Sequence, residues 1–525
     1  MASNSDRVIA VVSPRSRGGV SIFDMGEAFT AESVQEFRSE EPVIRSTVHE
    51  LQKKGCEVLN VGPMTISFAA SPKQFQDLFG VKVNKEKKDL LQGLSKVEYF
   101  TATAEETKKL REPPKALKPM IEGVAIAHPP DLFASPLPPI APIDPDAYRY
   151  FFAPDDIAVM LRSSRVHRLG GTGHDIVIAM IDTGHYAHPF FNWHGYRVLP
   201  TLLGPGQSDP GDDSVGHGTG ESANLFAAAP DIRLLPIKGV LDPVGDFNVA
   251  MAATPRPHII SNSWGYNVDH QSWVELRENE PYLPYLSYDY LRLLEATIVL
   301  AVSEGIVVCF AAGNSEKGFP GSHLDVISVG GVHVNYPELS LEASSYASSF
   351  ASQLYPGRHC PDLCGLVGKA VKVEYRIRAP GIMLPVQPDS DLDWKAPSTG
   401  ATNDGWGIFS GTSAACPQVA GVAALLLEKK PGMSPSEVKA KLMATARDVT
   451  VGTSANGESA GPGVDNATGA GLVDAKWAYI TTFGDVAAEF IGSSSEKQRQ
   501  MFESGQMPRE TADFIADFMD TLRSR

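Results

Sequence analysis

Apolar runs of two kinds alternate along this chain, and together they predict an α/β protein. The unbroken run of residues 175–184 and the β-branched run of residues 306–310 are typical of parallel strands that are buried on both faces of a sheet. The small residues of segment 220–229 and the apolar stretch that begins at Thr412 favour helices that pack closely on such a sheet. We therefore expect a doubly wound parallel α/β sheet over residues 150–478.

The first 125 residues carry a different pattern, that of a small α+β module. The predicted elements are, in order, a strand at residues 7–13, a helix at 32–54, strands at 56–61 and 64–70, a helix at 72–79, and strands at 81–84 and 97–102. This βαββαβ order is that of a ferredoxin-like fold. An unrelated regulatory or scaffold domain is the alternative interpretation.

The remaining segments are marked by proline, by polar composition and by helical spacing. Residues 126–149 are rich in proline and predict a stiff, extended linker. Self-cleavage somewhere in residues 115–150 is a hypothesis, although the prolines could equally protect the linker. Segments 343–379 and 385–406 are polar and are expected to be loops that shape a cleft. Residues 479–525 predict a helical C-terminal tail that is either docked, frayed or bound to a partner.

Four polar residues at the ends of predicted elements indicate nucleophilic catalysis. Asp182 closes the first apolar run, and His217 opens the small-residue helix. Ser413 follows Gly411 at a helix N-terminus, where backbone N–H groups favour the negative charge of an oxyanion. Asn314 ends the second run, where its amide can donate to the same oxyanion. A lone serine in this position would more simply be an N-cap, but the three other residues favour a nucleophile.

These motifs together resemble those of the subtilisin-like serine proteases. Asp-Thr-Gly begins at Asp182, His-Gly-Thr begins at His217, Ala-Ala-Gly-Asn ends at Asn314, and Gly-Thr-Ser-Ala-x-x-Pro surrounds Ser413. The order of aspartate, histidine and serine is also that of the family. The resemblance implies that His217 is the general base, that Asp182 orients it, and that Ser413 is the nucleophile. It also implies that the Asn314 side chain and the Ser413 N–H form the oxyanion hole.

The resemblance further implies a peptide-binding edge and an inhibitory N-terminal module. The residues expected to bind substrate are Ser263, Trp264, Gly265, Ala312 and Gly313. The first three match the family segment that binds a peptide as an added strand, and Trp264 is expected to border the S1 pocket. Residues 1–125 resemble the family's prodomain, which chaperones folding and lays its C-terminal strand in the cleft as an inhibitor. The expected protein is thus a serine endopeptidase that acts on proteins or peptides and is made as a zymogen.

Two alternatives stay open at this point. Gly220 replaces the family's usual second histidine, and Glu221 lies four residues after His217. A glutamate here raises the related acid proteases called sedolisins, in which glutamate replaces the histidine and aspartate replaces the oxyanion asparagine. The other alternative is a latent or inactive protease-fold protein that its prodomain inhibits and that acts through a partner. With a histidine base, activity is expected to rise at about pH 6 to 7.

Composition limits the partners and the compartment. The formal net charge of −16 makes nucleic acid or an anionic membrane an unexpected partner. The N-terminus lacks the features of a secretory signal, and no apolar run reaches membrane-spanning length. The 5 cysteines are an odd and sparse set, which fits a reducing compartment. We therefore expect a cytoplasmic protein, with export by another route left open.

No metal or cofactor is expected from the sequence. Cys360 and Cys364 could pair or bind a metal, but their spacing is not that of a usual zinc knuckle. Asp209, Asp212 and Asp213 raise the question of calcium, which is common in the family. They do not form a loop of alternating oxygen ligands, so a solvated loop is expected and calcium stays open.

Overall fold

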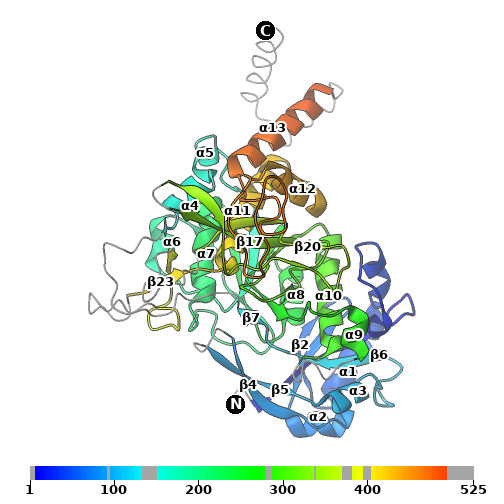
Figure 1. The fold of residues 1–525 in the computed structure, drawn as a ribbon. Helices are drawn as coiled ribbons and strands as arrows, with labels where there is room; N and C mark the ends of the chain where they lie inside the picture. Colours follow the sequence, from blue (N-terminus) through cyan, green and yellow to red (C-terminus); the bar gives the residue numbers. More distant parts are fainter. Residues whose placement is uncertain are drawn as a thin grey trace.

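The computed structural model of this chain describes residues 6–90, 95–132, 151–278, 286–335, 338–368, 381–393 and 404–492, with side chains described up to residue 485. Within these ranges the chain forms a large α/β unit around a mostly parallel sheet and a small N-terminal unit with an antiparallel sheet. Figure 1 shows the small unit, in blue, against one side of the large one.

The sheet of the large unit has nine strands within the described residues. In spatial order they are β10 (Arg197–Val198), β12 (Arg233–Lys238), β9 (Val177–Asp182), β13 (Ile259–Asn262), β15 (Val307–Ala311), β17 (Ile327–Asn335) and β18 (Ser340–Ala343), with β11 (Leu202–Leu203) beside β12 and β21 (Leu363–Leu366) beside β17. Every pairing is parallel except that of β17 with β18. The doubly wound parallel fold predicted from the apolar runs is confirmed.

Two pairs of helices pack on this sheet. One pair is α7 (His217–Ala228) with α11 (Thr412–Lys429), and the other is α8 (Pro243–Ala252) with α10 (Tyr288–Ser303). Small residues let the first pair approach closely, because a side chain at Gly421 would lie 2.6 Å from Ala228 Cβ and 2.8 Å from the backbone of α7. All residues of β9, β13 and β15 are buried, as expected for strands that are covered on both faces.

The small unit has the strand order β2-β3-β1-β6, and its neighbouring strands are antiparallel. These strands are β1 (Val8–Pro14), β2 (Glu57–Val61), β3 (Ile66–Ala70) and β6 (Ile121–Ile126), with helices α1 (Glu41–Lys53) and α2 (Pro72–Phe79) in the connections. With the two helices this is the βαββαβ arrangement of a ferredoxin-like fold, as predicted.

A strand forms at the predicted residues 97–102, but it lies outside the four-stranded sheet of this unit, which β6 closes instead. The segment before β6 forms a separate hairpin of β4 (Asn84–Asp89) and β5 (Lys96–Thr101), so a strand begins at residue 84 where residues 81–84 were expected. β4 has the sequence Asn-Lys-Glu-Lys-Lys-Asp, which is too charged to lie in a buried sheet.

The predicted helix at residues 32–54 is also divided. A 3-10 turn, η3 (Ser33–Phe37), precedes α1, which begins at Glu41. The break follows from Pro42, because proline is tolerated in the first turn of a helix but not in its interior.

Part of the predicted linker and insertions has regular structure. The small unit extends beyond residue 125, since β6 ends at Ile126 and a short strand, β7 (Asp131–Leu132), follows. The 343–379 segment was expected to be a loop but contributes β21 to the main sheet. Residues 385–406 contain the ends of β22 (Ile382–Pro385) and β23 (Trp406–Phe409), which pair with each other.

The tail prediction can be followed only in part. Helix α13 (Ala475–Gly492) forms the start of the predicted tail, and residues 493–525 lie outside the described residues, as do residues 133–150 of the linker. Among the helices that the structure describes, none is both long and apolar enough to cross a membrane.

The small unit docks on α8 and α10 through buried polar contacts as well as apolar ones. Thr65 Oγ1 on the small unit accepts a hydrogen bond from Asn248 Nδ2 (2.8 Å), and Arg111 Nε forms an ion pair with Asp289 Oδ2 (2.7 Å). The Asp289 side chain is only 1% exposed, so its charge depends on Arg111 for compensation.

Arg111→Ala is expected to loosen this docking. The substitution leaves the Asp289 carboxylate buried without its cationic partner, which costs about 2 to 4 kcal/mol for a pair with one partly exposed member. Thermal unfolding of the full chain should therefore begin at a lower temperature. Arg45→Ala is the control, because the Arg45–Glu41 pair is exposed and should contribute less than about 1 kcal/mol. Equal effects of the two variants would contradict the assignment.

Candidate active site

Asp182 and His217 meet where a strand ends and a helix begins. Asp182 is the last residue of β9, and His217 is the first residue of α7. The imidazole Nδ1 lies 2.7 Å from Asp182 Oδ1, and both side chains are almost fully buried. A hydrogen bond at Nδ1 fixes the ring orientation and leaves Nε2 as the nitrogen that can accept a proton.

Asp213 holds the two backbone segments of this pair together. Its carboxylate accepts hydrogen bonds from Thr183 Oγ1 (2.7 Å), Thr219 N (2.8 Å), Thr219 Oγ1 (2.6 Å) and Gly216 N (3.0 Å). Burial raises the pKa of Asp213, although the threonine hydrogen bonds oppose this. The solvated-loop interpretation is therefore wrong for Asp213, which is fully buried. The sequence signal that could have identified Asp213 as part of the site is its position three residues before Gly216.

Ser413 lies at the N-terminal turn of α11 and is bonded to the strand edge rather than to His217. Its Oγ donates to the Ser263 carbonyl (3.0 Å), and Ser263 Oγ donates to the Ser413 carbonyl (2.9 Å). Within the described part of the chain, His217 Nε2 has no hydrogen-bond partner. The structure thus joins Asp182 to His217 and Ser413 to Ser263, but it does not form the serine–histidine hydrogen bond. Such bonds are often absent before substrate binds.

Asn314 is fixed beside the nucleophile by the start of α11. Its Oδ1 accepts from Thr412 N (2.9 Å) and Thr412 Oγ1 (3.1 Å). Gly313 N donates to the same threonine hydroxyl (3.2 Å), and Gly313 has a φ of +119°, which favours glycine. Ala312 is buried and donates its N–H to Val329 O (2.9 Å). Because two donors engage Oδ1, the amide group of Asn314 has its donor side turned away from Thr412.

The predicted substrate edge is occupied by the chain's own N-terminal unit. β7 pairs antiparallel with β14 (Trp264–Asn267), with Leu132 opposite Trp264 and Asp131 opposite Gly265. The Trp264 side chain does not border a pocket as expected. It is fully buried, and its Nε1 donates to the Ile181 carbonyl of β9 (3.0 Å), so only its main chain reaches the edge.

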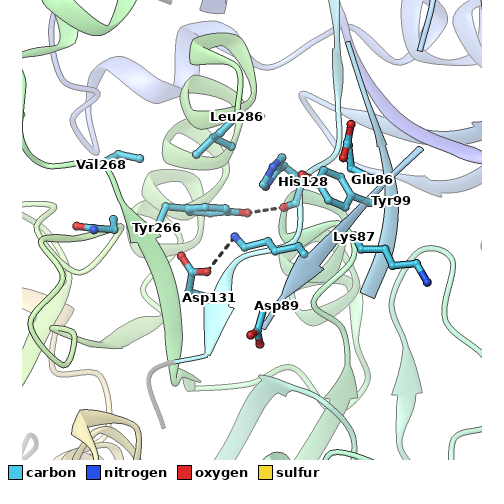
Figure 2. A pocket seen from close by; sticks show the side chains of 11 residues that line it. Glu86, Lys87, Asp89, Tyr99, His128, Asp131, Tyr266, Val268 and Leu286 are labelled. Carbon is cyan, nitrogen blue, oxygen red and sulfur yellow. Dashed lines mark hydrogen bonds and ion pairs between the residues drawn. The ribbon is translucent and has the colours of Figure 1, made fainter. Parts of the chain in front are cut away.

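A pocket of about 430 Å³ lies between the β4–β5 hairpin and β14. Figure 2 shows that His128 and Asp131 line this pocket between the strands of the hairpin and Tyr266 of β14. Tyr266 OH of β14 donates to the His128 carbonyl (2.7 Å), and Lys88 of β4 forms an ion pair with Asp131 (3.1 Å). Burial lowers the pKa of His128 to about 3, with the charge of Lys88 acting in the same direction. The segment that leads into β7 is therefore held from both sides.

The surroundings of His217 shift its titration. Burial lowers the pKa of His217, but the charge of Asp182, its hydrogen bond and the charges of Glu221 and Asp213 outweigh burial and raise this pKa to about 9. A general base must be neutral, and the imidazole is charged below its pKa. If His217 acts as a general base, activity is therefore expected to rise at a higher pH than the ordinary histidine range predicted from the sequence.

The replacement of the family's second histidine by Gly220 has a packing reason. A Cβ at Gly220 would lie 2.5 Å from the ring of Phe409. The same ring stacks over His217, with centroids 6.1 Å apart and an angle of 25° between the rings. Phe409 thus fills the space beside α7 and covers one face of the His217 imidazole.

The remaining candidates contribute no ligand set within the described residues. All five cysteines are free and buried, including Cys360 and Cys364. In the described ranges no three histidine, cysteine or acidic side chains come together as metal ligands. Asp212 pairs with Lys238 (3.0 Å) and accepts from Gln387 Nε2 (3.0 Å). The calcium question and the cytoplasmic location stay predictions.

Comparisons with known proteins identify the family of this chain. The model of the subtilase family matches residues 173–471, which is more than half of the chain. Serine protease AprX of Bacillus subtilis is 30% identical over 291 residues, covering 51% of this chain and 60% of that protein. Subtilisin NAT of Bacillus subtilis subsp. natto is 27% identical over 303 residues, covering 54% of this chain and 64% of that protein. The chain thus spans less than two thirds of these relatives.

A solved structure shows the same fold. Fervidolysin from Fervidobacterium pennivorans, described as a keratinolytic enzyme related to subtilisin, superposes with a TM-score of 0.53 at 18% identity, covering 90% of this chain and 61% of that one. The chain belongs to the subtilase family, and the resemblance seen in its sequence is confirmed.

Gly220→Ala is expected to disturb the packing beside the candidate base. The added methyl group forces the buried Phe409 ring to move, which costs about 1 to 3 kcal/mol of folding free energy. Gly484→Ala is the matched control, because among the residues that the structure describes no atom lies within 4 Å of a Cβ there and alanine favours a helix. Chemical denaturation of both variants measures the difference. A Gly220 variant as stable as the control would contradict the packing explanation.

Proposed function

We propose that this chain is a serine endopeptidase that hydrolyses peptide bonds in proteins or peptides. The observation that carries the proposal is the buried Asp182–His217 hydrogen bond beside the reciprocal Ser263–Ser413 pair. Membership of the subtilase family supports the same chemistry. A histidine base bonded to aspartate, together with Asn314 at the oxyanion position, favours this function over that of a sedolisin.

The proposed reaction uses each of these groups in turn. His217 Nε2 takes the proton of Ser413 Oγ while this oxygen attacks the substrate carbonyl, and Asp182 stabilises the imidazolium that results. The Asn314 amide and the Ser413 N–H donate to the oxyanion at the start of α11. Protonation of the leaving amine by His217 releases the first product, and water then hydrolyses the acyl-enzyme. The main chain of β14 holds the substrate as an added strand.

We further propose that the N-terminal unit is a prodomain that keeps this enzyme latent. β7 pairs with the strand on which a substrate would lie, so a peptide competes with the chain's own segment. Asp182, His217 and Ser413 are each no more than 1% exposed. An enzyme with this arrangement must release the small unit before it can act on other proteins.

The register of β7 on β14 supports one processing bond. Leu132 is opposite Trp264, and a strand that continued by one residue would bring that residue opposite Ser263, next to Ser413 Oγ. The residue after Leu132 is Phe133, which lies outside the described residues. We therefore propose cleavage between Phe133 and Ala134.

Labelling with a fluorophosphonate tests the activity. This reagent reacts with an activated serine, so protein that has been processed and freed of the N-terminal unit should gain a single adduct at Ser413, measured by intact mass, and Ser413→Ala should gain none. The loss of Ser413 should lower peptide hydrolysis by several orders of magnitude. Labelling that persists in Ser413→Ala would overturn the assignment of the nucleophile. A processed chain that stays unlabelled would contradict the activity.

The processing bond has its own test. Incubated wild-type protein should yield a mature species whose N-terminal residue is Ala134, identified by mass spectrometry, whereas Ser413→Ala should stay intact. Phe133→Asp should slow this cleavage, because a charged residue then replaces the apolar one at the proposed cleavage bond. Glu36→Asp, on the small unit away from β7, serves as the control. A mature N-terminus at another residue would contradict the register argument.

A further inference from the structure

Glu221 is a buried acid beside the candidate base. It is fully buried one turn after His217 on α7, and its Oε1 lies 3.9 Å from His217 Nε2. Neither atom has a hydrogen-bond partner among the residues that the structure describes. A buried carboxyl oxygen without a partner is costly, and such groups gather at functional sites.

The other carboxyl oxygen of Glu221 is anchored in a defined chain of hydrogen bonds. Oε2 accepts from Asn224 Nδ2 (2.8 Å), and Asn224 Oδ1 accepts from Gln418 Nε2 (3.2 Å). Gln418 in turn bonds to both the N–H (2.8 Å) and the carbonyl (3.1 Å) of Leu366 on β21. The carboxyl is thus fixed between α7, α11 and the sheet, with its free oxygen on the Nε2 side of the imidazole.

We propose that Glu221 is a positioning residue for the peptidase proposed above. It is a second carboxyl partner that stabilises the imidazolium of His217 from the Nε2 side, and it thereby sets the pH at which His217 loses its proton and can act as a base. Asp182 holds the Nδ1 side of the same ring (2.7 Å). The ring therefore lies between two acids, and each ionised acid favours its charged form. The catalytic role of Glu221 rests on the proposed function, whereas the test, which is the titration of His217, does not.

The ionisable surroundings are consistent with this role. The groups that face His217 are Asp182, Asp213 and Glu221; those that face Glu221 are His217, Asp182, Tyr346 and Cys416. Burial raises the pKa of Glu221 to about 8, with the charge of His217 opposing and that of Asp182 adding to the rise. Glu221 thus loses its proton in the alkaline range in which the imidazole also titrates, and the two groups titrate as a coupled pair.

The consequence for catalysis has two parts. Where Glu221 is ionised, its carboxylate favours the charged imidazole, which cannot take the Ser413 proton, and the nucleophile stays bonded to Ser263. During reaction at higher pH, Nε2 receives that proton, and an ionised Glu221 stabilises the charge that develops. Glu221 therefore makes His217 a stronger base and moves its working range upward.

The test measures the titration of His217 directly in the full chain. A Ser413→Ala background prevents self-cleavage, and NMR follows the His217 Nδ1 proton in the hydrogen bond to Asp182 as the pH changes. Glu221→Gln keeps the shape and an acceptor for Asn224 but removes the charge. Its titration midpoint should fall by about one pH unit or more. An unchanged midpoint would overturn the proposal.

Two further variants keep the result interpretable. Glu428→Gln makes the same chemical change at the far end of α11, about 22 Å from Ser413, and should leave the midpoint unchanged. Glu221→Asp keeps the charge on a shorter side chain, so it should show a smaller fall, and it replaces Glu221→Gln as the test if that variant does not fold. A midpoint in Glu221→Asp equal to that of the parent chain would then overturn the proposal.

The effect of Glu221 on catalysis is measured separately, in the chain that keeps Ser413. The pH at which fluorophosphonate labelling is half-maximal should shift downward with Glu221→Gln by the same amount as the NMR midpoint. Absence of labelling in every variant after removal of the N-terminal unit would contradict the proposed peptidase, whereas the NMR midpoint would still decide the role of Glu221. A uniform loss of labelling rate with no shift in pH would identify Glu221 as merely structural.

Discussion

The hydrogen bond between Asp182 and His217 joins the sheet to helix α7, and the rest of the site depends on this junction. Asp182 is placed by β9 in the middle of the sheet, and His217 by the first turn of α7. Asp213 bonds to the residues on either side of this junction, so the carboxylate and the imidazole are held by their backbones as well as by each other. Ser413 and Asn314 then take their places because α11 packs against α7 and across the ends of β13 and β15.

Much of this arrangement could be predicted from the sequence. Long apolar runs are forced into the interior of the sheet, so the strands that end at Asp182 and near Asn314 follow from hydrophobicity alone. The small residues of α7 and α11 likewise predict close helix packing. Motif order then predicts the three catalytic candidates, of which the structure joins Asp182 to His217.

What the sequence could not predict depends on contacts between distant segments. The role of Asp213 needs the two threonines that surround it in space, and its neighbours along the chain resemble an ordinary acidic loop. The burial of Trp264 depends on a carbonyl of β9, which lies about eighty residues earlier in the chain. The charged composition of β4 gives no sign that the hairpin contacts β7 through the ion pair of Lys88 with Asp131. The partner of Gly220 is Phe409, which lies 189 residues later in the chain (409 − 220).

The contacts around His128 and Asp131 separate two events that are easily taken for one. Tyr266 and Lys88 hold His128 and Asp131 from opposite units, and neither contact involves the backbone after Leu132. A cut beyond β7 would therefore change the connectivity of the chain without removing any of these interactions. The severed piece would leave only at the rate at which that whole interface dissociates. The cleaved chain with its N-terminal unit still bound and the enzyme with an open cleft would then be distinct states of the molecule. The dissociation rate of the interface would set the time between them.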